Sequence, residues 1–325
     1  MATKNNDLVI GVDLGGTKIY SAVVDRQGKI IATARKKTKS ELGFNVVAKR
    51  IADCIFEAAE NAQVDFTSIK AVGVGSPGPL DLKAGKIIET PNLKWKDAPL
   101  RAKIEEYVKK PVKIDNDGNV GILGEYAYGA GHGAQHLVGL FIGTGIGGGA
   151  IINGELLHGY NENAGELGHM ILDPNGPKCG CGNNGCLEAF ASRLAIERDI
   201  RIAEINGVAT HVFEGMEDKS ERLRSKRLAE AFAANDPAAT QAIENSAKYV
   251  GYGVASLLNI FNPEVVVLGG GLVEAIGEPY VKLVRQVAEK NVFAVALRNV
   301  RIVAAELLDD SAVLGAAMLG WQIAK

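Results

Sequence analysis

The sequence of 325 residues has no strong excess of either charge, and its formal net charge is −2. A large nucleic-acid footprint needs a basic face, so this balance argues against nucleic acid as a partner. No apolar run approaches the length that spans a bilayer, so no membrane partner is expected. The N-terminal segment MATKNNDLVIGVD carries no apolar signal stretch, so we expect a reducing, cytoplasmic compartment.

Cysteine is also scarce, and its placement is uneven. Three of the four cysteines, Cys179, Cys181 and Cys186, lie within eight positions, and His169 precedes them. One imidazole and three thiolates form a complete tetrahedral set for zinc with no open position, as in structural sites. The alternative is one disulfide and one free thiol, but Cys179 and Cys181 are too close to pair easily. In a reducing compartment the cluster favours zinc.

Glycine, in contrast, is abundant: the chain has 39, and they gather in a few short loops. Such loops suggest close approach of the backbone to a ligand, because glycine has no side chain to obstruct it. Buried-strand patterns at 8–12 and 19–25 flank the sequence DLGGTK, and a second pair at 137–143 and 149–154 flanks TGIGG. The repeated order of strand, glycine turn and strand suggests two related halves.

The glycine turns allow three interpretations as ligand-binding loops. A Walker A loop is absent, and the GxGxxG match at 143–148 precedes a strand, whereas a dinucleotide-binding loop opens a helix. Ordinary hairpin turns explain the glycines but leave four polar neighbours unexplained: Asp13, Thr17, Lys18 and Thr144. We therefore favour paired turns whose amide groups and threonine hydroxyls grip phosphates. In that case Asp13 is placed to hold Mg²⁺, through water.

A short acidic sequence, Asp115-Asn116-Asp117, follows a strand pattern at 112–114 and precedes a helical pattern at 120–128. Paired acids near a nucleotide site suggest a general base together with a hydroxyl-binding amide. A plain turn is the alternative, since Asp, Asn and Gly all favour turns, and taken alone it is the simpler explanation.

The rest of the chain mixes strand and helix patterns without a Pro-rich or Ser-rich linker. The further elements expected are strands at 30–33, 263–272 and 300–304, a strand with a tight loop at 69–79, and helices at 43–62, 238–260, 278–289 and 311–324. The charged run between 217 and 232 is expected to be a solvated helix, and Cys54 is expected in the core. This pattern favours an α/β fold with a mixed sheet in each of two domains.

Seven motifs occur here in the order in which one protein family carries them: DLGGTK, SPGP, DNDGN, IGTGIGGG, GELGH, CxCGxxGCLE and VVLGGG. On these motifs the chain resembles the ROK (repressor, open reading frame, kinase) family from residue 8 to 320, and within it the bacterial glucokinases. The pair GELGH and CxCGxxGCLE is highly specific, whereas the glycine turns alone are not.

The resemblance implies an actin-like ATPase (ribonuclease H-like) fold, in which two α/β domains with mixed sheets close across a cleft on ATP and a hexose. By analogy, residues 1–118 and about 305–325 would form the smaller domain, and residues 119–304 the larger domain with a zinc-binding loop. A homodimer or homotetramer and a place in glycolysis are also implied.

The implied activity is ATP-dependent phosphorylation of a hexose, with glucose converted to glucose 6-phosphate. A kinase for fructose, mannose or an N-acetylhexosamine is one alternative, and a non-catalytic sugar sensor is another. Repressors of the family carry a winged DNA-binding domain before the sugar domain, whereas here the first phosphate turn already begins at Asp13, which favours a kinase.

Carried over residue by residue, the resemblance makes Asp117 the base that takes the proton from the 6-hydroxyl of the sugar. The other expected sugar contacts are Asn116, Glu166, His169 and Glu188, with Gly78 and Asn92 lining the pocket. The residues matching structural zinc ligands are His169, Cys179, Cys181 and Cys186. The residues matching nucleotide-binding positions are Asp13 (also the magnesium position), Gly15, Gly16, Thr17, Lys18, Thr144 and Gly145 for the phosphates, and Gly269, Gly270 and Gly271 for adenosine.

One departure from the family pattern lies beside the expected base. The family reads Glu-Asn-Asp-Ala-Asn where this chain has DNDGN, so Asp115 and Gly118 differ. The base and the asparagine are kept, so the resemblance still implies activity, with a looser entry into the following helix.

Overall fold

The computed structural model describes residues 7–90, 93–218 and 220–324. The chain forms two compact units: unit 1 comprises Met1–Gly133, Glu155–Gly165 and Asp309–Lys325, and unit 2 comprises Ala134–Gly154 and Glu166–Leu308. The first boundary follows Gly133 rather than residue 118, because the helix that begins at Asp117 packs against the C-terminal helix of unit 1.

Unit 1 is built on a five-stranded mixed sheet in the order β3-β2-β1-β4-β8. Its strands are β1 (Leu8–Leu14), β2 (Lys18–Val24), β3 (Ile30–Lys37), β4 (Ile69–Ser76) and β8 (Val112–Asn116). The first three strands pair antiparallel, and β1, β4 and β8 pair parallel. A second sheet, three-stranded, contains β5 (Leu80–Asp81), β6 (Lys86–Thr90) and β7 (Trp95–Ala98). The sequence patterns did not predict this smaller sheet.

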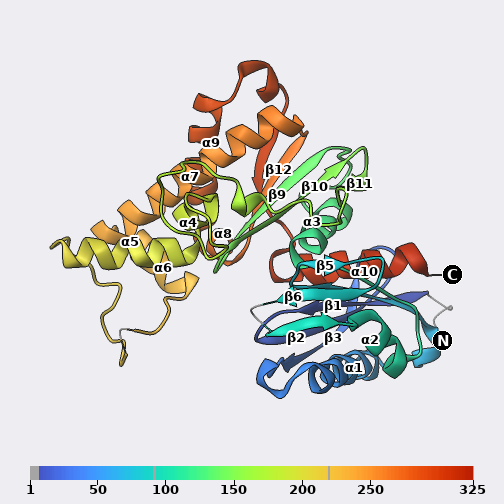
Figure 1. The fold of residues 1–325 in the computed structure, drawn as a ribbon. Helices are drawn as coiled ribbons and strands as arrows, with labels where there is room; N and C mark the ends of the chain where they lie inside the picture. The colour runs from blue at the N-terminus through green and yellow to red at the C-terminus, as the bar shows by residue number, and fades with distance from the viewer. Residues whose placement is uncertain (1–6, 91–92, 219, 325) are drawn as a thin grey trace. The chain divides into compact units, whose positions relative to one another are not determined.

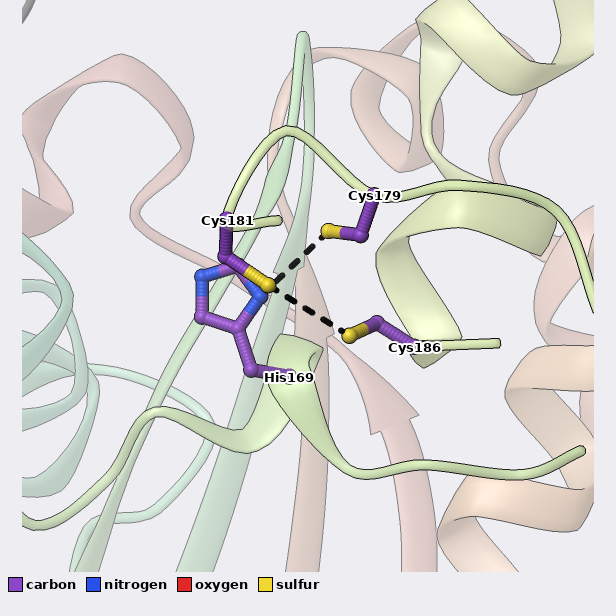
Figure 2. Close-up of side chains that lie close together, drawn as sticks. All are labelled: His169, Cys179, Cys181 and Cys186. Carbon is purple, nitrogen blue, oxygen red and sulfur yellow. Dashed lines mark hydrogen bonds between the residues drawn. The ribbon is translucent and has the colours of Figure 1, made fainter. Parts of the chain in front are cut away.

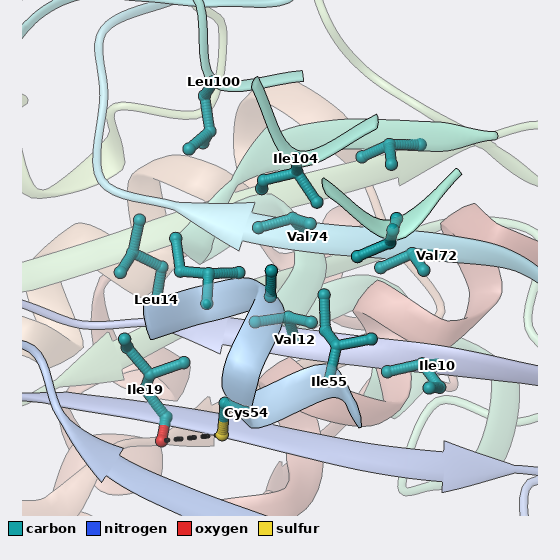
Figure 3. Packing of buried hydrophobic residues seen from close by; sticks show 14 of the residues in the cluster. Ile10, Val12, Leu14, Ile19, Cys54, Ile55, Val72, Val74, Leu100 and Ile104 are labelled. Carbon is teal, nitrogen blue, oxygen red and sulfur yellow. Dashed lines mark hydrogen bonds between the residues drawn. The ribbon is translucent and has the colours of Figure 1, made fainter. Parts of the chain in front are cut away.

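Helices cover both faces of the larger sheet of unit 1 (Figure 1). They are α1 (Phe44–Asn61), α2 (Leu100–Val108), α3 (Asp117–Tyr128) and α10 (Ser311–Ile323). On one face, apolar side chains of α1 and α2 meet those of the strands, and the buried Cys54 lies among them as expected (Figure 3). On the other face α10 approaches so closely that a Cβ on Gly73 would lie 1.7 Å from the carbonyl oxygen of Ala316. Small residues on α10 and on the strands allow this approach.

Unit 2 repeats the plan with strands in the order β10-β9-β12-β13. These strands are β9 (Leu137–Ile142), β10 (Ile146–Ile152), β12 (Val265–Gly269) and β13 (Arg301–Ala304), whereas the two-residue strand β11 (Glu155–Leu156) lies in a segment that belongs to unit 1. Strands β9 and β10 pair antiparallel, while β9, β12 and β13 pair parallel. The antiparallel hairpin β9–β10 therefore matches the hairpin β1–β2 of unit 1, and the parallel strands β12 and β13 match β4 and β8. The predicted duplication and the α/β fold with mixed sheets are confirmed.

The helices of unit 2 are α4 (Leu187–Ala191), α5 (Arg193–Ile205), α6 (Ser225–Ala233), α7 (Pro237–Phe261), α8 (Gly271–Ile276) and α9 (Glu278–Asn291). The longest, α7, packs against α5 and α9 (Figure 1). At its start the Asp236 carboxylate accepts a hydrogen bond from the Ala239 amide. In the charged run between 217 and 232, the helix begins at Ser225, and the described residues before it are not helical, so the prediction was wrong for them. Within the described residues, no helix combines the length and the apolar character needed to cross a bilayer.

Candidate functional site: two glycine turns, an acidic helix entry and a cysteine cluster

The first glycine turn joins β1 to β2 and is fixed by hydrogen bonds from its own hairpin and from Thr38. The Gly15 amide donates to the Lys18 carbonyl at 2.9 Å, which closes the turn. The Thr38 hydroxyl donates to the Gly15 carbonyl at 2.7 Å, and the Thr38 amide donates to the Thr17 carbonyl at 2.9 Å. Thr38 is fully buried, so the turn keeps its shape without a ligand. The sequence patterns did not identify this residue.

Two charged side chains flank the first turn. Burial raises the pKa of Asp13 to about 6, while the positive charge of Lys18 lowers it and the carboxylate of Asp117 raises it further. The Lys18 ammonium lies 3.5 Å from an Asp309 carboxylate oxygen, and both side chains are exposed. Asp13, which is influenced by the charge of Asp117, and the exposed Lys18 therefore lie at the same end of the sheet of unit 1.

The acidic sequence lies at the junction of β8 and α3. The Asn116 carboxamide oxygen accepts hydrogen bonds from the Gly118 amide at 2.8 Å and from the Asn119 amide at 3.4 Å, which caps the helix. The Gly118 amide also donates to the Asp117 carboxylate at 2.9 Å. A Cβ on Gly78 would lie 3.1 Å from the Asn116 carboxamide nitrogen, so Gly78 adjoins this site. Asn92, also expected to line it, lies outside the described residues.

The Asp117 carboxyl combines solvent access with a raised pKa. Its residue is exposed by surface area. The surrounding protein nevertheless desolvates the carboxyl, and this raises its pKa against the opposing hydrogen bond from the Gly118 amide. The two observations agree, because water on one side of a carboxyl does not remove the low-dielectric surroundings on its other sides. Such a group is accessible to a substrate and holds a proton more readily than an ordinary aspartate.

The second glycine turn, between β9 and β10, is held by Arg193. The Gly143 amide donates to the Gly145 carbonyl at 2.9 Å, and the Gly143 carbonyl accepts from the Arg193 amide at 2.9 Å. The Arg193 guanidinium donates to the Thr144 hydroxyl at 2.7 Å and also to the Leu223 carbonyl. Burial lowers the pKa of Arg193, but arginine stays charged, so the turn carries a fixed cation. The sequence patterns gave no sign of this contact.

The glycines after β12 lie against the same end of unit 2. A Cβ on Gly270 would lie 2.7 Å from the Ile142 amide nitrogen, and Gly270 has a φ of 84°. Gly270 precedes α8, and a Cβ on Gly271 would lie 3.4 Å from the Ser225 hydroxyl. Since Ile142 precedes the second glycine turn, the structure brings Gly269–Gly271 beside that turn.

Glu188 joins the second glycine turn to the cysteine cluster. Its carboxylate accepts a hydrogen bond from the Ile146 amide at 2.9 Å. The other carboxylate oxygen lies 3.5 Å from the Cys179 sulfur, which donates to it. A Cβ on Gly145 would lie only 2.3 Å from the first oxygen, so the turn is glycine where the carboxylate approaches. Glu188 thus depends on both neighbours for its position.

The four expected metal ligands converge (Figure 2). The ligand atoms of His169, Cys179, Cys181 and Cys186 all lie within 4.8 Å of one another. The Cys181 and Cys186 sulfurs are 3.6 Å apart, and the Cys179 sulfur lies 3.7 Å from His169 Nδ1. A tetrahedral zinc site with bonds of about 2.0–2.3 Å places its ligand atoms roughly 3.5–3.8 Å apart, so the set fits a zinc ion. The sulfur separation is far too long for a disulfide.

Glu166 and His169 bracket a short turn just before the cluster. The turn η3 (Leu167–His169) closes where the Glu166 carbonyl accepts a hydrogen bond from the His169 amide at 3.0 Å. Glu166 is exposed and His169 is half-buried. Unit 2 therefore groups Glu166, His169 and Glu188 with the cysteines and the second turn, while unit 1 groups Asp13, Lys18, Gly78, Asn116 and Asp117.

Together, the fold and its paired glycine turns define a protein of the actin-like ATPase fold class. The ROK family model matches residues 9–323, so the protein belongs to the ROK family. The chain is 36% identical to the glucokinase of Thermotoga maritima over 312 residues, which are 96% of each chain. It is 33% identical to a putative xylose repressor of Caldicellulosiruptor sp. over 96% of this chain and 77% of that protein.

A solved structure is similar over nearly the whole chain. It is that of a ROK family glucokinase from Streptomyces griseus in complex with glucose and AMPPNP, with a TM-score of 0.82 and 34% identity. The similarity covers 97% of this chain and 99% of that one. The family resemblance inferred from the motifs is therefore confirmed.

Proposed function

We propose that the protein is a hexose kinase that transfers the terminal phosphoryl group of ATP to the 6-hydroxyl of glucose. The observation that carries this proposal is that, within unit 1, the accessible Asp117 carboxyl lies near enough to Asp13 at the first glycine turn for its charge to raise the pKa of Asp13. A sugar sensor has no use for a base beside a phosphate turn. The similarity to proteins named glucokinases supports the same assignment.

The roles of the residues follow from the chemistry of phosphoryl transfer, which depends on positioning and on charge stabilisation. Asp117 accepts the proton of the 6-hydroxyl, and Asn116 offers a carboxamide to a neighbouring hydroxyl. The amides and threonine hydroxyls of the two glycine turns bind phosphate oxygens, and Lys18 and Arg193 add positive charge. Asp13 would hold, through water, the Mg²⁺ that accompanies ATP, and the ion would offset phosphate charge. Gly269–Gly271 lie on the adenosine side.

On the sugar side, Glu166, His169 and Glu188 offer hydrogen-bonding groups to the remaining hydroxyls. The zinc ion that the cysteine cluster fits would have a complete ligand set and no open position, so it would fix the loop and take no part in the chemistry. With Nδ1 facing the cluster, His169 keeps Nε2 for a hydroxyl. A bound zinc ion would thereby fix the directions in which the His169 and Glu188 side chains point.

A coupled ADP-release assay over a panel of sugars tests the proposed activity and its specificity. We expect the highest kcat/KM with glucose and lower values with fructose, mannose and N-acetylhexosamines, and we expect no ADP release without sugar. Highest efficiency with another hexose would reject glucose but keep the kinase. Sugar binding by calorimetry with no ADP release from ATP would reject the kinase and support a sensor. Replacing ATP with polyphosphate in the same assay tests the donor.

The contact between Gly145 and Glu188 gives a second test. In Gly145→Ala the added methyl group would overlap a Glu188 carboxylate oxygen, so the carboxylate must leave the Ile146 amide. We expect kcat/KM for glucose to fall about tenfold through this displacement. Gly147→Ala is the control, because a Cβ there meets nothing within 4 Å. Equal activity of the two variants would contradict the assigned role of Glu188.

A further inference from the structure

The segment Glu155–Gly165 is fixed to unit 1 by two side chains that the proposed chemistry does not use. Glu162 accepts hydrogen bonds from the Leu82 amide at 2.7 Å and the Lys83 amide at 3.3 Å. His158 Nε2 lies 2.7 Å from an Asp115 carboxylate oxygen. The first contact holds a loop of unit 1. The second reaches the residue that begins the acidic sequence of the site.

Asp115 is fully buried, and both of its carboxylate oxygens have partners. One oxygen is the His158 partner, while the other accepts from the Asn116 amide at 2.8 Å and from the Asn119 carboxamide at 2.9 Å. These two donors lie on either side of Asp117 in the sequence. The carboxylate therefore holds the backbone of Asn116 before the proposed base and the side chain of Asn119 after it. These contacts hold the entry to α3.

His158 is the titratable partner of the buried Asp115 carboxylate. The hydrogen bond to Asp115 is the largest influence and raises the pKa of His158, which burial opposes. The Glu162 carboxylate also raises this pKa, and the Lys113 ammonium lowers it. The imidazole borders a cavity of about 530 Å³ in unit 1, whose other charged wall residues are Lys83, Arg101, Lys113 and Glu162. The ring is one-third exposed, so it exchanges protons with solvent.

We propose that His158 is a positioning residue for phosphoryl transfer: acting through Asp115, it holds Asn116 and Asp117 in place at the entry to α3. This inference rests on the proposed role of Asp117 as the base. Removing one partner of a buried ion pair leaves an uncompensated charge, which is more harmful than removing both. If His158 acts through Asp115, removing His158 alone should therefore lower activity more than removing His158 and the Asp115 charge together. A residue that only stabilises the fold would not show this difference.

The test compares His158→Ala, His158→Gln and Asp115→Asn/His158→Ala in the ADP-release assay across pH. In His158→Ala we expect kcat to fall about ten- to a hundredfold, more than KM for glucose rises, because the base is misplaced. The unpaired Asp115 charge should also raise the pKa of Asp117, so the acid limb of the kcat profile moves to higher pH. His158→Gln keeps a donor without charge, so kcat should recover in part while the acid limb stays shifted.

The double variant decides the mechanism. Asp115→Asn removes the unpaired charge and keeps an oxygen for the Asn116 amide, so kcat should exceed that of His158→Ala and the acid limb should return toward its wild-type position. The control that should keep kcat is His211→Ala, which removes an exposed imidazole paired with Glu214 at 2.6 Å.

The proposal is overturned if folded His158→Ala keeps the wild-type kcat and pH profile, or if the double variant is no better than His158→Ala. Circular dichroism establishes folding, and His158→Gln provides the comparison if the alanine variant does not fold. Failure of the proposed function is a separate outcome: it appears as absent sugar-dependent ADP release in the wild type, or as full activity in Asp117→Asn, before any His158 variant is compared.

Discussion

Asp117→Asn is expected to fold and to bind glucose while kcat falls about 10²–10⁴-fold, the usual contribution of a general base. The substitution preserves the shape of the side chain, and the asparagine oxygen can still accept the Gly118 hydrogen bond. It removes the negative charge and, with it, the ability to take the proton of the attacking hydroxyl. The ADP-release assay gives kcat, and calorimetric titration with glucose gives binding. A kcat within threefold of the wild type would show that Asp117 is not the base.

The control for this prediction is Asp97→Asn, an exposed aspartate paired with Lys86 at 3.1 Å. Loss of that surface pair should leave kcat and glucose binding unchanged, since exposed ion pairs contribute little to stability. If both aspartate variants lost activity equally, the effect at Asp117 would reflect general damage. Equal glucose affinities with a large difference in kcat would isolate the proton transfer.

The raised pKa of Asp117 also predicts the direction of a stability change. Because burial raises the folded-state pKa above the unfolded value, the folded protein holds this proton more tightly. The carboxyl therefore lowers the free energy of unfolding as pH rises from its unfolded-state pKa to its folded-state pKa. Above the folded-state pKa this loss of stability stays constant. Asn cannot ionise, so Asp117→Asn should unfold at the same temperature as the wild type, or a higher one, near pH 7 in thermal scans. A desolvated carboxylate lowers the stability of the fold, and the proposed role of Asp117 as the base explains why it is retained.

The sequence was informative where the site is made of neighbours in the chain. The turn at Asp13–Lys18 needs glycine and threonine at adjacent positions, and the cysteines lie close to His169 in sequence, so both could be predicted. The repeated hairpin also follows local patterning, which is why the α/β fold with mixed sheets could be predicted. The boundary after Gly133 depends on packing of α3 against the distant helix α10, which local patterns do not reveal.

The residues that hold the site in shape could not be predicted, because each acts from a distant position. Thr38 reaches the Gly15 carbonyl, Arg193 reaches Thr144, and His158 reaches Asp115. Each contact joins segments separated by 23 to 49 positions. In the sequence alone, a threonine, an arginine at a helix start and a histidine in a loop are each compatible with many roles. Their contacts with the site become visible only in the folded chain.

Loss of the zinc ion proposed for the cysteine cluster is expected to have the second large effect. In Cys181→Ser one ligand is gone, and we expect the protein to lose zinc and kcat/KM for glucose to fall about a hundredfold, at the upper end of the losses caused by disturbing a metal-anchored shell. Cys181 is exposed, so serine itself causes no packing defect. The damage passes through Glu188, which lies against both Cys179 and the Ile146 amide. A freed loop would therefore disturb the sugar contacts and the second phosphate turn together.

The measurements for this variant are zinc content by mass spectrometry of the metal, glucose affinity by calorimetry and the thermal unfolding temperature. All three should fall in Cys181→Ser, and a strong zinc chelator should reproduce the losses in the wild type. Cys54→Ala is the matched control, because Cys54 lies in the core of unit 1 and belongs to no metal cluster found among the described residues. Its zinc content should equal that of the wild type. One zinc ion per chain in Cys181→Ser together with an unchanged KM for glucose would contradict the proposal that the cysteine cluster positions the sugar contacts.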